Sequence, residues 1–323
     1  MPRQPDVTLI QLRYFVKAAS HLSMTKAADE LHIAQSAVSA AVSQLEHQIG
    51  TQLFIRHRAR GLVLTAAGEE MLRDTRTLLD HMEEVLDSAS GHVDRIRGRV
   101  RLACFVTLGP FILPRLIAEL GEQHPDLQVD VIETEAHAMR AALRNGSAEV
   151  ALTYDLGLGA GIDAEVLGVA PPYVALAHDH PLANSGGVHL ADLADEPMVL
   201  LDLPESRDYF ETLLVDAGVT PHIRYRSASY ETVRGLVARG HGYSILNQRP
   251  ASEGTYDGGR VAAVPIKGDA PGLPIVLARS TAVRTTARAR AVAVAARAIF
   301  ASKKTPRKGR NARASSATPS RHS

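Results

Sequence analysis

Short amphipathic helices separated by brief polar breaks are predicted for the first part of the chain. Apolar side chains recur three or four residues apart near the N-terminus and predict a first helix: Ile10, Leu12, Phe15, Val16 and Ala19. Ser23 precedes a second periodic stretch, residues 24–31, and is predicted to be its N-cap. A third helix is predicted over residues 36–48, ending at Gly50, because glycine often terminates helices.

The pattern then changes to a hairpin and a long helix. Two short apolar runs, 53–55 and 62–64, flank an arginine-rich tip and predict a β-hairpin. Thr65 is a predicted cap for a helix over residues 66–90. A line of leucines seven residues apart follows that helix and favours pairing with another helix, the alternative being packing against its own domain: Leu72, Leu79 and Leu86.

Strands and helices alternate after a polar hinge at residues 91–98. Strands are expected near 100–104, 127–132, 150–153, 173–177, 198–201, 223–226, 243–246, 261–264 and 275–278, and helices near 111–123, 136–145, 209–217, 231–239 and 286–300. Such alternation predicts parallel sheets covered by helices. Residues 301–323 hold seven basic side chains and no acid, which predicts a disordered tail. That tail either attracts DNA phosphate or is only solvated.

Charge is distributed unevenly along a chain that is nearly neutral as a whole. The 323 residues carry 36 Lys and Arg against 35 Asp and Glu, a net charge of +1. Residues 1–65 carry seven basic and four acidic side chains, net +3, whereas residues 66–90 carry two and seven, net −5. The N-terminal module is therefore the part suited to nucleic acid. Three arginines at the hairpin tip suit phosphate or minor-groove contact: Arg56, Arg58 and Arg60.

Residues 24–43 have the pattern of a helix-turn-helix. Ala27 and Ala28 permit two helices to cross closely, and a core of larger side chains fills the crossing: Leu31, Ile33, Val38, Val42 and Leu45. Short polar side chains remain on the outward face of the second helix: Gln35, Ser36, Ser39 and Ser43. Such groups suit a recognition helix in the major groove, since glutamine can bond adenine and serine can bond several bases or phosphates.

The N-terminal 60 residues resemble the LysR-type transcriptional regulator family. The resemblance rests on the segments 12–16, 23–28, 31–39, 45–46, 50, 53–56 and 64–68, which have the family's residues and spacing. It implies that Ala37 also faces bases or phosphates, that Thr25 and Lys26 approach the DNA backbone, and that Arg56 belongs to the wing. Ala40 and Ala41 depart from the Arg or Gln of many relatives, so fewer base contacts are expected there.

The resemblance also implies an overall fold class. It is an N-terminal winged helix-turn-helix, mainly α, plus a long linker helix, then an α/β periplasmic-binding-protein-like effector domain of two lobes. The expected organisation is 1–65 DNA-binding domain, 66–90 linker and dimerisation helix, 91–98 hinge, 99–300 effector-binding domain and 301–323 basic tail. The lobe crossings are expected near residues 163–169 and 264–267.

Effector-binding candidates follow from the rule that ligands bind at the carboxyl ends of strands. Thr107 lies between a strand and a helix start, where a hydroxyl and backbone N–H groups suit a carboxylate. Ser206 is equally a helix cap, and Arg207 is equally a surface cation. Tyr243 and Ser244 follow a Gly-His-Gly loop and could line the cleft.

No enzyme motif is found that competes with this interpretation. The loop 157–161 is glycine-rich but departs from a dinucleotide fingerprint at Ile162, and the pair His178 and His180 precedes a proline and favours a turn over a metal site. We expect no catalytic residue, metal or cofactor. The single cysteine, Cys104, is expected to be a small buried hydrophobe rather than a redox sensor.

The expected protein is a cytoplasmic, effector-controlled, sequence-specific transcription regulator. No apolar run long enough for a membrane span and no apolar secretion signal is present. The expected partners are double-stranded operator or promoter DNA, a small-molecule effector with a carboxylate as one candidate, and a second copy in a homodimer or homotetramer. RNA polymerase is a further candidate partner.

Overall fold

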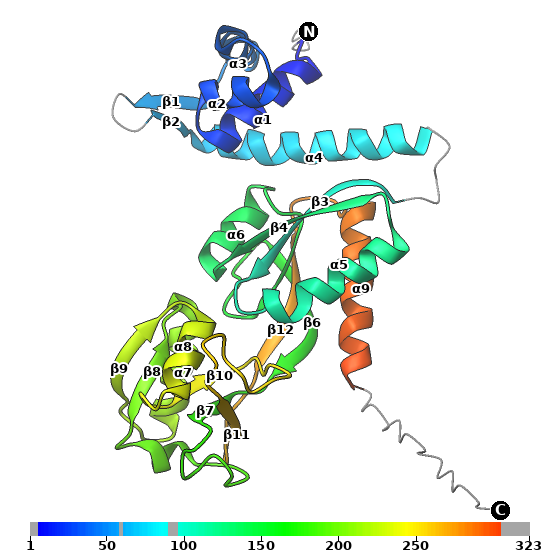
Figure 1. Cartoon of the computed structure of the whole chain (residues 1–323). Helices are drawn as coiled ribbons and strands as arrows, with labels where there is room; N and C mark the ends of the chain where they lie inside the picture. Colours follow the sequence, from blue (N-terminus) through cyan, green and yellow to red (C-terminus); the bar gives the residue numbers. More distant parts are fainter. Residues whose placement is uncertain (1–5, 58–60, 90–95, 305–323) are drawn as a thin grey trace, which may run out of the picture.

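Three parts follow one another along the chain (Figure 1). The computed structural model describes residues 6–57, 61–89 and 96–304. A small N-terminal domain is followed by a long helix, α4, which lies between that domain and a two-lobed α/β domain. Among the described residues, no helix combines the length and the apolar character needed to span a bilayer.

The N-terminal domain is a three-helix unit with a two-stranded wing. Its elements are α1 (Leu9–His21), α2 (Met24–Leu31), α3 (Gln35–Ile49), β1 (Phe54–His57) and β2 (Gly61–Leu64). Thr8 and Gln11 form a capping box at α1, and the Ser23 hydroxyl accepts a hydrogen bond from the Lys26 N–H as the predicted cap of α2. Gly50 ends α3 with a φ of 71°, which glycine adopts without strain.

The predicted core of the helix-turn-helix is confirmed. Ala27 and Ala28 are buried at the crossing, together with Val38, Val42 and Leu45. Leu31 and Ile33 are half-buried against the same cluster. Phe15 meets Phe54 of the wing edge-to-face, with ring centroids 5.5 Å apart, so the wing is packed onto the helices.

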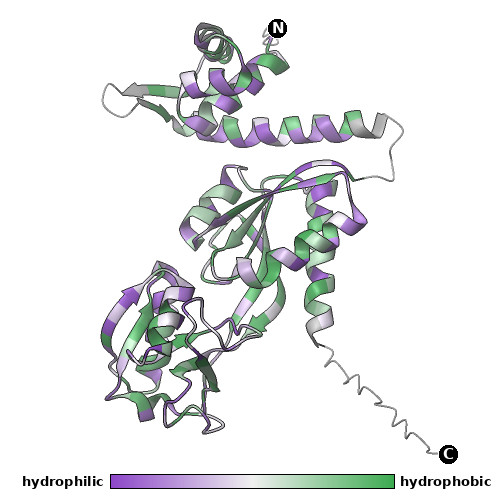
Figure 2. Ribbon diagram, viewed as in Figure 1, coloured by the Kyte–Doolittle hydropathy of each residue, from purple (hydrophilic) through white to green (hydrophobic). Residues whose placement is uncertain are grey.

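Helix α4 (Ala66–Ala89) is amphipathic along its length (Figure 2). The Thr65 hydroxyl accepts a hydrogen bond of 2.9 Å from the Gly68 N–H, as expected of a cap. The predicted leucine line is not one continuous seam, because Leu72 is buried in the core of the N-terminal domain. Exposed apolar side chains on α4 include Leu78 and Val85, at 51% and 66% exposure.

The first lobe is built on a mixed five-stranded sheet of order β4-β3-β5-β12-β6. Its elements are β3 (Gly98–Phe105), α5 (Gly109–Gln123), β4 (Leu127–Thr134), α6 (Ala136–Arg144), β5 (Val150–Tyr154), β6 (Ile162–Ala170), β12 (Leu273–Ser280) and α9 (Ala287–Lys304). Helices α5 and α9 pack beside each other, and side chains of the sheet and helices form one core.

The second lobe contains two smaller sheets, of order β10-β7-β11 and β8-β9. Its elements are β7 (Tyr173–Ala177), the 3-10 helix η1 (Leu190–Leu193), β8 (Pro197–Leu201), α7 (Pro204–Asp216), β9 (His222–Ser227), α8 (Tyr230–Ala238), β10 (Ser244–Leu246) and β11 (Val261–Pro265). It has a separate cluster of buried side chains around Tyr243 and Phe210.

The expectation of parallel sheets needs correction. Parallel pairing holds for β3 with β4 and β5, and for β8 with β9. By contrast, β12 runs antiparallel to β5 and β6, and β7 runs antiparallel to β10 and β11. The reason is that the chain returns from the second lobe through β12, which enters the first sheet from the opposite end.

The lobe crossings also differ from the prediction. Residues 163–169, expected as a crossing, belong to β6 and pair with β12. The crossing itself is Pro171-Pro172, between the end of β6 and the start of β7. The return segment begins after Pro265 and ends at Leu273, so it overlaps the predicted 264–267 and extends further.

The closing helix is longer than predicted, and several predicted segments lie outside the described residues. Helix α9 continues to Lys304, four residues beyond the predicted end of the closing helix. Most of the predicted tail, the hairpin-tip residues Arg58 and Arg60, and most of the hinge at 91–98 lie outside the described residues.

Candidate DNA-reading surface and inter-lobe cavity

Helix α3 presents a polar face opposite its buried face. Gln35, Ser36, Ala37 and Ser43 are exposed and Ser39 is half-buried. No side chain caps the start of α3, because the cap position is Ala34. Backbone N–H groups at such a start suit a phosphate oxygen. Ala40 is exposed and Ala41 half-buried, and neither can hydrogen-bond a base.

Glu46 positions the wing against α3. One of its carboxylate oxygens accepts hydrogen bonds from the Leu53 and Phe54 N–H groups, at 2.8 and 3.0 Å. Strands β1 and β2 then pair from Phe54–Leu64 to His57–Gly61, so the tip residues 58–60 connect their ends. Arg56 lies in β1, but its side chain is outside the described part.

The basic side chains of the N-terminal domain face different directions. Thr25 and Lys26 are exposed at the start of α2. Arg13 and Lys17 instead border a pocket of about 360 Å³ against α4 and the first lobe. Lys17 also pairs with Glu30 at 2.5 Å. Arg13 and Lys17 therefore do not lie beside α3. The wing arginines must then supply more of the positive charge that contacts DNA.

A small polar cavity lies between the two lobes. Its volume is about 10 Å³, about enough for one water molecule, so a larger molecule would enter only if the lobes or side chains moved. The lining residues are Thr107, Tyr154, Leu201, Ser206, Phe210, Tyr230, Asn247, Gln248 and Leu273.

Hydroxyl and amide groups fix the geometry of this cavity. The Gln248 side-chain amide donates to the Tyr154 hydroxyl at 3.0 Å, and the Tyr173 hydroxyl donates to the Gln248 carbonyl at 2.9 Å. The Tyr230 hydroxyl donates to the same carbonyl. Burial raises the pKa of Tyr154 to about 12, although hydrogen bonds with Thr107 and Gln248 act in the opposite direction. Tyr154 therefore offers a neutral hydroxyl at physiological pH.

The predicted effector-binding residues divide into two groups. Thr107 and Ser206 are both buried and both line the cavity. Arg207 is not among the lining residues, and its guanidinium Nε donates to Asp202 at 2.6 Å. Tyr243 and Ser244 are fully buried within the second lobe and do not line the cavity either.

Four polar lining residues were not predicted: Tyr154, Tyr230, Asn247 and Gln248. Three of them lie at the carboxyl ends of strands: Tyr154 is the last residue of β5, and Asn247 and Gln248 are the first two residues after β10. The rule that points to Thr107 therefore also points to them when it is applied to every strand. Tyr230 begins α8 and has no comparable signal in the sequence.

Arg76 of α4 connects the three parts of the molecule. Its guanidinium donates to the Ser20 hydroxyl of α1 at 2.9 Å and to the Asn145 carbonyl of the first lobe at 2.8 Å. Burial lowers the pKa of Arg76 to about 10, with the nearby Arg101 contributing. Arg76 therefore remains charged at neutral pH.

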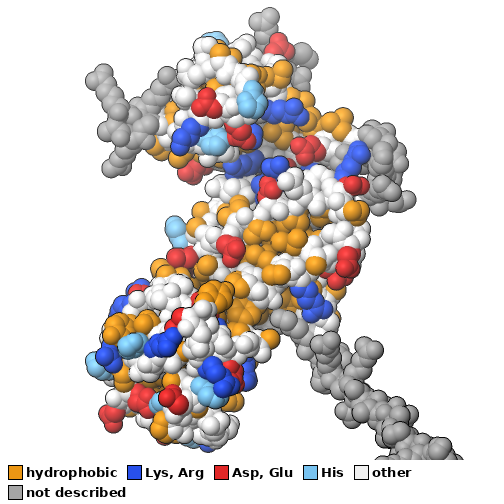
Figure 3. Space-filling view, viewed as in Figure 1, with side chains coloured by type: hydrophobic (Ala, Val, Ile, Leu, Met, Phe, Trp, Pro, Cys, Tyr) orange, Lys and Arg blue, Asp and Glu red, His pale blue; other side chains and the backbone are white. Residues whose placement is uncertain are grey.

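A mostly buried group of charged side chains holds α4 to the first lobe, and we call it the linker junction: Arg76, Asp80, Glu83, Arg101 and Arg288. The Asp80 carboxylate accepts two hydrogen bonds from Arg101, at 2.8 and 3.4 Å. Arg288 donates to Glu83 at 3.1 Å and has a side chain only 3% exposed. Basic and acidic side chains gather at this boundary (Figure 3).

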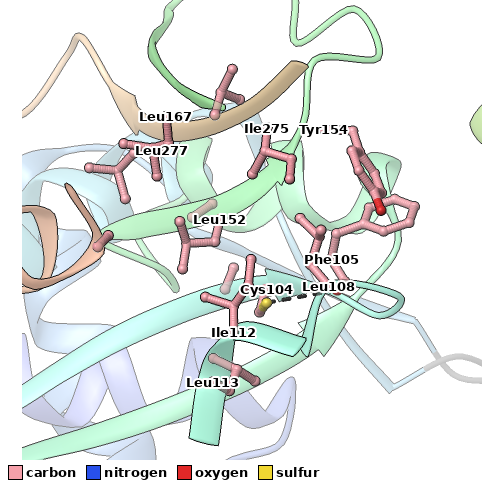
Figure 4. Close-up of a cluster of buried hydrophobic side chains, with 14 of the residues drawn as sticks. Cys104, Phe105, Leu108, Ile112, Leu113, Leu152, Tyr154, Leu167, Ile275 and Leu277 are labelled. Carbon is pink, nitrogen blue, oxygen red and sulfur yellow. Dashed lines mark hydrogen bonds between the residues drawn. The ribbon is translucent and has the colours of Figure 1, made fainter. Parts of the chain in front are cut away.

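Cys104 is fully buried in the core of the first lobe, as predicted (Figure 4). Its thiol lies among Ile112, Leu113 and Leu152, and it donates weakly to the Phe105 carbonyl. Burial raises the pKa of the thiol to about 12, with Glu133 adding to the shift. The reactive thiolate form is therefore scarce at neutral pH.

The fold and these two sites define a class of protein: a DNA-binding regulator whose helix-turn-helix is joined by a helix to a two-lobed effector domain. The chain belongs to the LysR family. The model of the bacterial regulatory helix-turn-helix protein, lysR family, matches residues 9–69, and that of the LysR substrate binding domain matches residues 94–301. It is a transcription regulator and not an enzyme.

Individual relatives agree with this assignment. The RuBisCO operon transcriptional regulator of Allochromatium vinosum is 34% identical over 245 residues, 75% of this chain and 80% of the relative. The DNA-binding transcriptional dual regulator OxyR of Escherichia coli is 29% identical over 236 residues, 73% and 77% of the two chains. The crystal structure of HinK, a LysR family regulator of Pseudomonas aeruginosa, is 34% identical, with a TM-score of 0.62 over 91% of this chain and 99% of that one.

Proposed function

We propose that this LysR-type regulator reads base edges through Gln35, Ser36, Ser39 and Ser43 of α3. Thr25, Lys26 and the wing arginines would hold the phosphate backbone, and Ala37 would pack near the bases. The observation that carries the proposal is the polar, accessible face of α3 opposite the buried Val38 and Val42. The small side chains at Ala40 and Ala41 allow close approach of the helix to the groove but leave base reading to the other positions.

Two variants are expected to distinguish base reading from binding to the DNA backbone. Gln35→Ala should lower preference for the selected operator by about 1–3 kcal/mol at the base pair it contacts, because it removes a bidentate partner. Arg56→Ala should weaken binding to all sequences alike. It should also reduce the slope of the logarithm of the affinity against the logarithm of the salt concentration by about one. The measurement is the dissociation constant for operator and unrelated duplexes at several salt concentrations.

Lys17→Ala is the matched control. Lys17 belongs to the same domain but lies beside Glu30, on the side of α4 and the first lobe. Its removal should leave the salt dependence of DNA binding unchanged. If Arg56→Ala altered the preference at one base pair, or if Lys17→Ala reduced the salt dependence as much, the division of roles would be wrong.

The effector is proposed to bind where the inter-lobe cavity now lies. The polar lining consists of hydroxyl and amide groups, with no lysine or arginine among the lining residues. Such a site favours a small polar molecule held by hydrogen bonds. A carboxylate is one candidate ligand, because its oxygens could accept hydrogen bonds from the Thr107 and Tyr154 hydroxyls near the start of α5.

An effector found by thermal-shift screening should bind about tenfold more weakly to Thr107→Val, because the variant keeps the side-chain volume but removes a hydroxyl donor. The dissociation constant from calorimetry checks this. Ser43→Ala, in the DNA-binding domain, is the control and should bind the effector as the wild type does. Equal affinity of Thr107→Val and wild type would place the effector elsewhere.

Self-association is proposed to involve the exposed apolar side chains of α4, with Leu78 and Val85 in contact with a second copy. LysR regulators form oligomers, and a helix pair would bury these two side chains. A dimer reads two half-sites related by two-fold symmetry, so a palindromic operator is the expected readout. RNA polymerase is the further partner proposed for a promoter-bound regulator of this kind.

A further inference from the structure

A second pocket lies at the crossings between the lobes, separate from the inter-lobe cavity, and we call it the hinge pocket. Its volume is about 530 Å³, within the usual range of small-molecule sites. It is lined by Leu167, Gly168, Val169, Ala170, Pro171, Pro172, Tyr173, Asn247, Gln248, Arg249, Ala263, Pro265, Ile275 and Phe300. Both lobes and the Pro171-Pro172 crossing therefore contribute to it, together with strands β11 and β12 on either side of the return segment.

The walls of the hinge pocket are mainly apolar. Leu167, Ile275 and Phe300 belong to the buried core of the first lobe, and Tyr173 begins the second lobe. Gly168 keeps the space open, since a Cβ atom there would lie 3.1 Å from the Phe300 ring. An apolar ligand body placed here would cover surface that water now contacts, which favours binding.

Arg249 gives the pocket a positive rim. Its side chain is exposed, and no ion pair of Arg249 is found within residues 6–57, 61–89 and 96–304. The lining contains no aspartate or glutamate. An apolar site with one cation and no carboxylate is complementary to an apolar acid.

The hinge pocket shares one wall with the inter-lobe cavity. Asn247 and Gln248 line both. The Asn247 amide donates to the Ala170 carbonyl at 3.0 Å, next to the crossing, whereas the Gln248 amide donates to the Tyr154 hydroxyl inside the cavity. A molecule in the hinge pocket would therefore contact Asn247 and Gln248, which also form one side of the inter-lobe cavity.

We propose that the hinge pocket is a second regulatory site that binds a small carboxylic acid with an apolar body. The carboxylate pairs with Arg249, and the body lies against Tyr173, Phe300 and the two prolines. Binding there stabilises one arrangement of the crossings and, through Asn247 and Gln248, changes the affinity of the inter-lobe cavity for its effector.

The test uses the full-length protein and 3-phenylpropanoate as the probe, with 3-phenylpropanamide as its uncharged counterpart. We expect the acid to bind the wild type at millimolar concentrations, measured by ligand-observed NMR titration, and the amide to bind about tenfold more weakly, because it lacks the charge-assisted hydrogen bond. Arg249→Gln should lose about tenfold in affinity for the acid but not for the amide.

Two further variants locate the probe. Ala263→Leu adds volume inside the pocket and should weaken both probes, whereas Arg224→Gln, an exposed arginine on β9, should weaken neither. Absence of acid binding to the wild type, or equal acid affinity of Arg249→Gln and wild type, would overturn the proposal. So would loss of acid binding in Thr107→Val with retention in Arg249→Gln, since that result places the probe in the inter-lobe cavity.

Discussion

Asp80→Asn is expected to destabilise the contact between α4 and the first lobe by about 3 kcal/mol, because it leaves the mostly buried Arg101 guanidinium without its closest charged partner and removes one of the two acidic partners of Arg288. The Asp80 side chain is 13% exposed, and those of its partners Arg101 and Arg288 are 25% and 3% exposed. Glu149 and Glu83 still face these arginines, so the loss should be at the lower end of the range for broken buried pairs. Urea unfolding followed by circular dichroism measures it.

A functional loss should accompany the loss of stability. The linker junction joins α4 to the first lobe, and Arg76 extends this contact to α1. With the junction weakened, the N-terminal domain should still bind operator DNA, but the effector should no longer change its affinity. Asp74→Asn is the control, because the Asp74 side chain is 61% exposed and its pair with Arg73 contributes little. Equal stability of the two variants would show that the junction does not hold α4.

Gly68→Ala is expected to have the second large effect, although alanine normally favours a helix over glycine by about 0.5–1 kcal/mol. A Cβ atom at Gly68 would lie 2.1 Å from the Leu53 carbonyl oxygen, so α4 and the wing would have to move apart. We expect a net destabilisation of at least about 1–3 kcal/mol, the usual cost of overpacking, together with weaker DNA binding because the wing shifts relative to α3.

Gly121→Ala separates this steric effect from helix propensity. Gly121 lies inside α5, and a Cβ atom there would meet nothing within 4 Å. That variant should be unchanged or stabilised by about 0.5–1 kcal/mol. Thermal unfolding of both variants provides the comparison. A Gly68→Ala protein as stable as Gly121→Ala would mean that the close approach of α4 to the wing is not required.

Local sequence patterns were sufficient for the DNA-binding half. The capping side chain at Ser23, the small Ala27 and Ala28, and the terminating Gly50 act within a few residues, and each predicted the element that is found. The polar face of α3 follows from the same periodicity, since its buried positions fix which side chains remain outside.

Long-range pairing explains what the sequence did not predict. Strand β6 is an edge strand whose outward Asp163 and Glu165 pair with Arg279 and Arg297, so it lacks the apolar alternation of a half-buried strand. The linker junction brings Asp80 to Arg288, about two hundred positions later. The sequence alone does not distinguish Arg207 from a ligand-binding arginine, because its partner Asp202 is recognised only in the folded structure.

Selection of binding sites from random duplex DNA measures whether α3 and the wing read a specific operator. We expect the full-length wild type to enrich a motif with two half-sites related by two-fold symmetry, and Gln35→Ala to relax the preference at the same position in each half-site. Enrichment of no motif by the wild type, or an identical motif with undiminished preference for Gln35→Ala, would contradict this expectation.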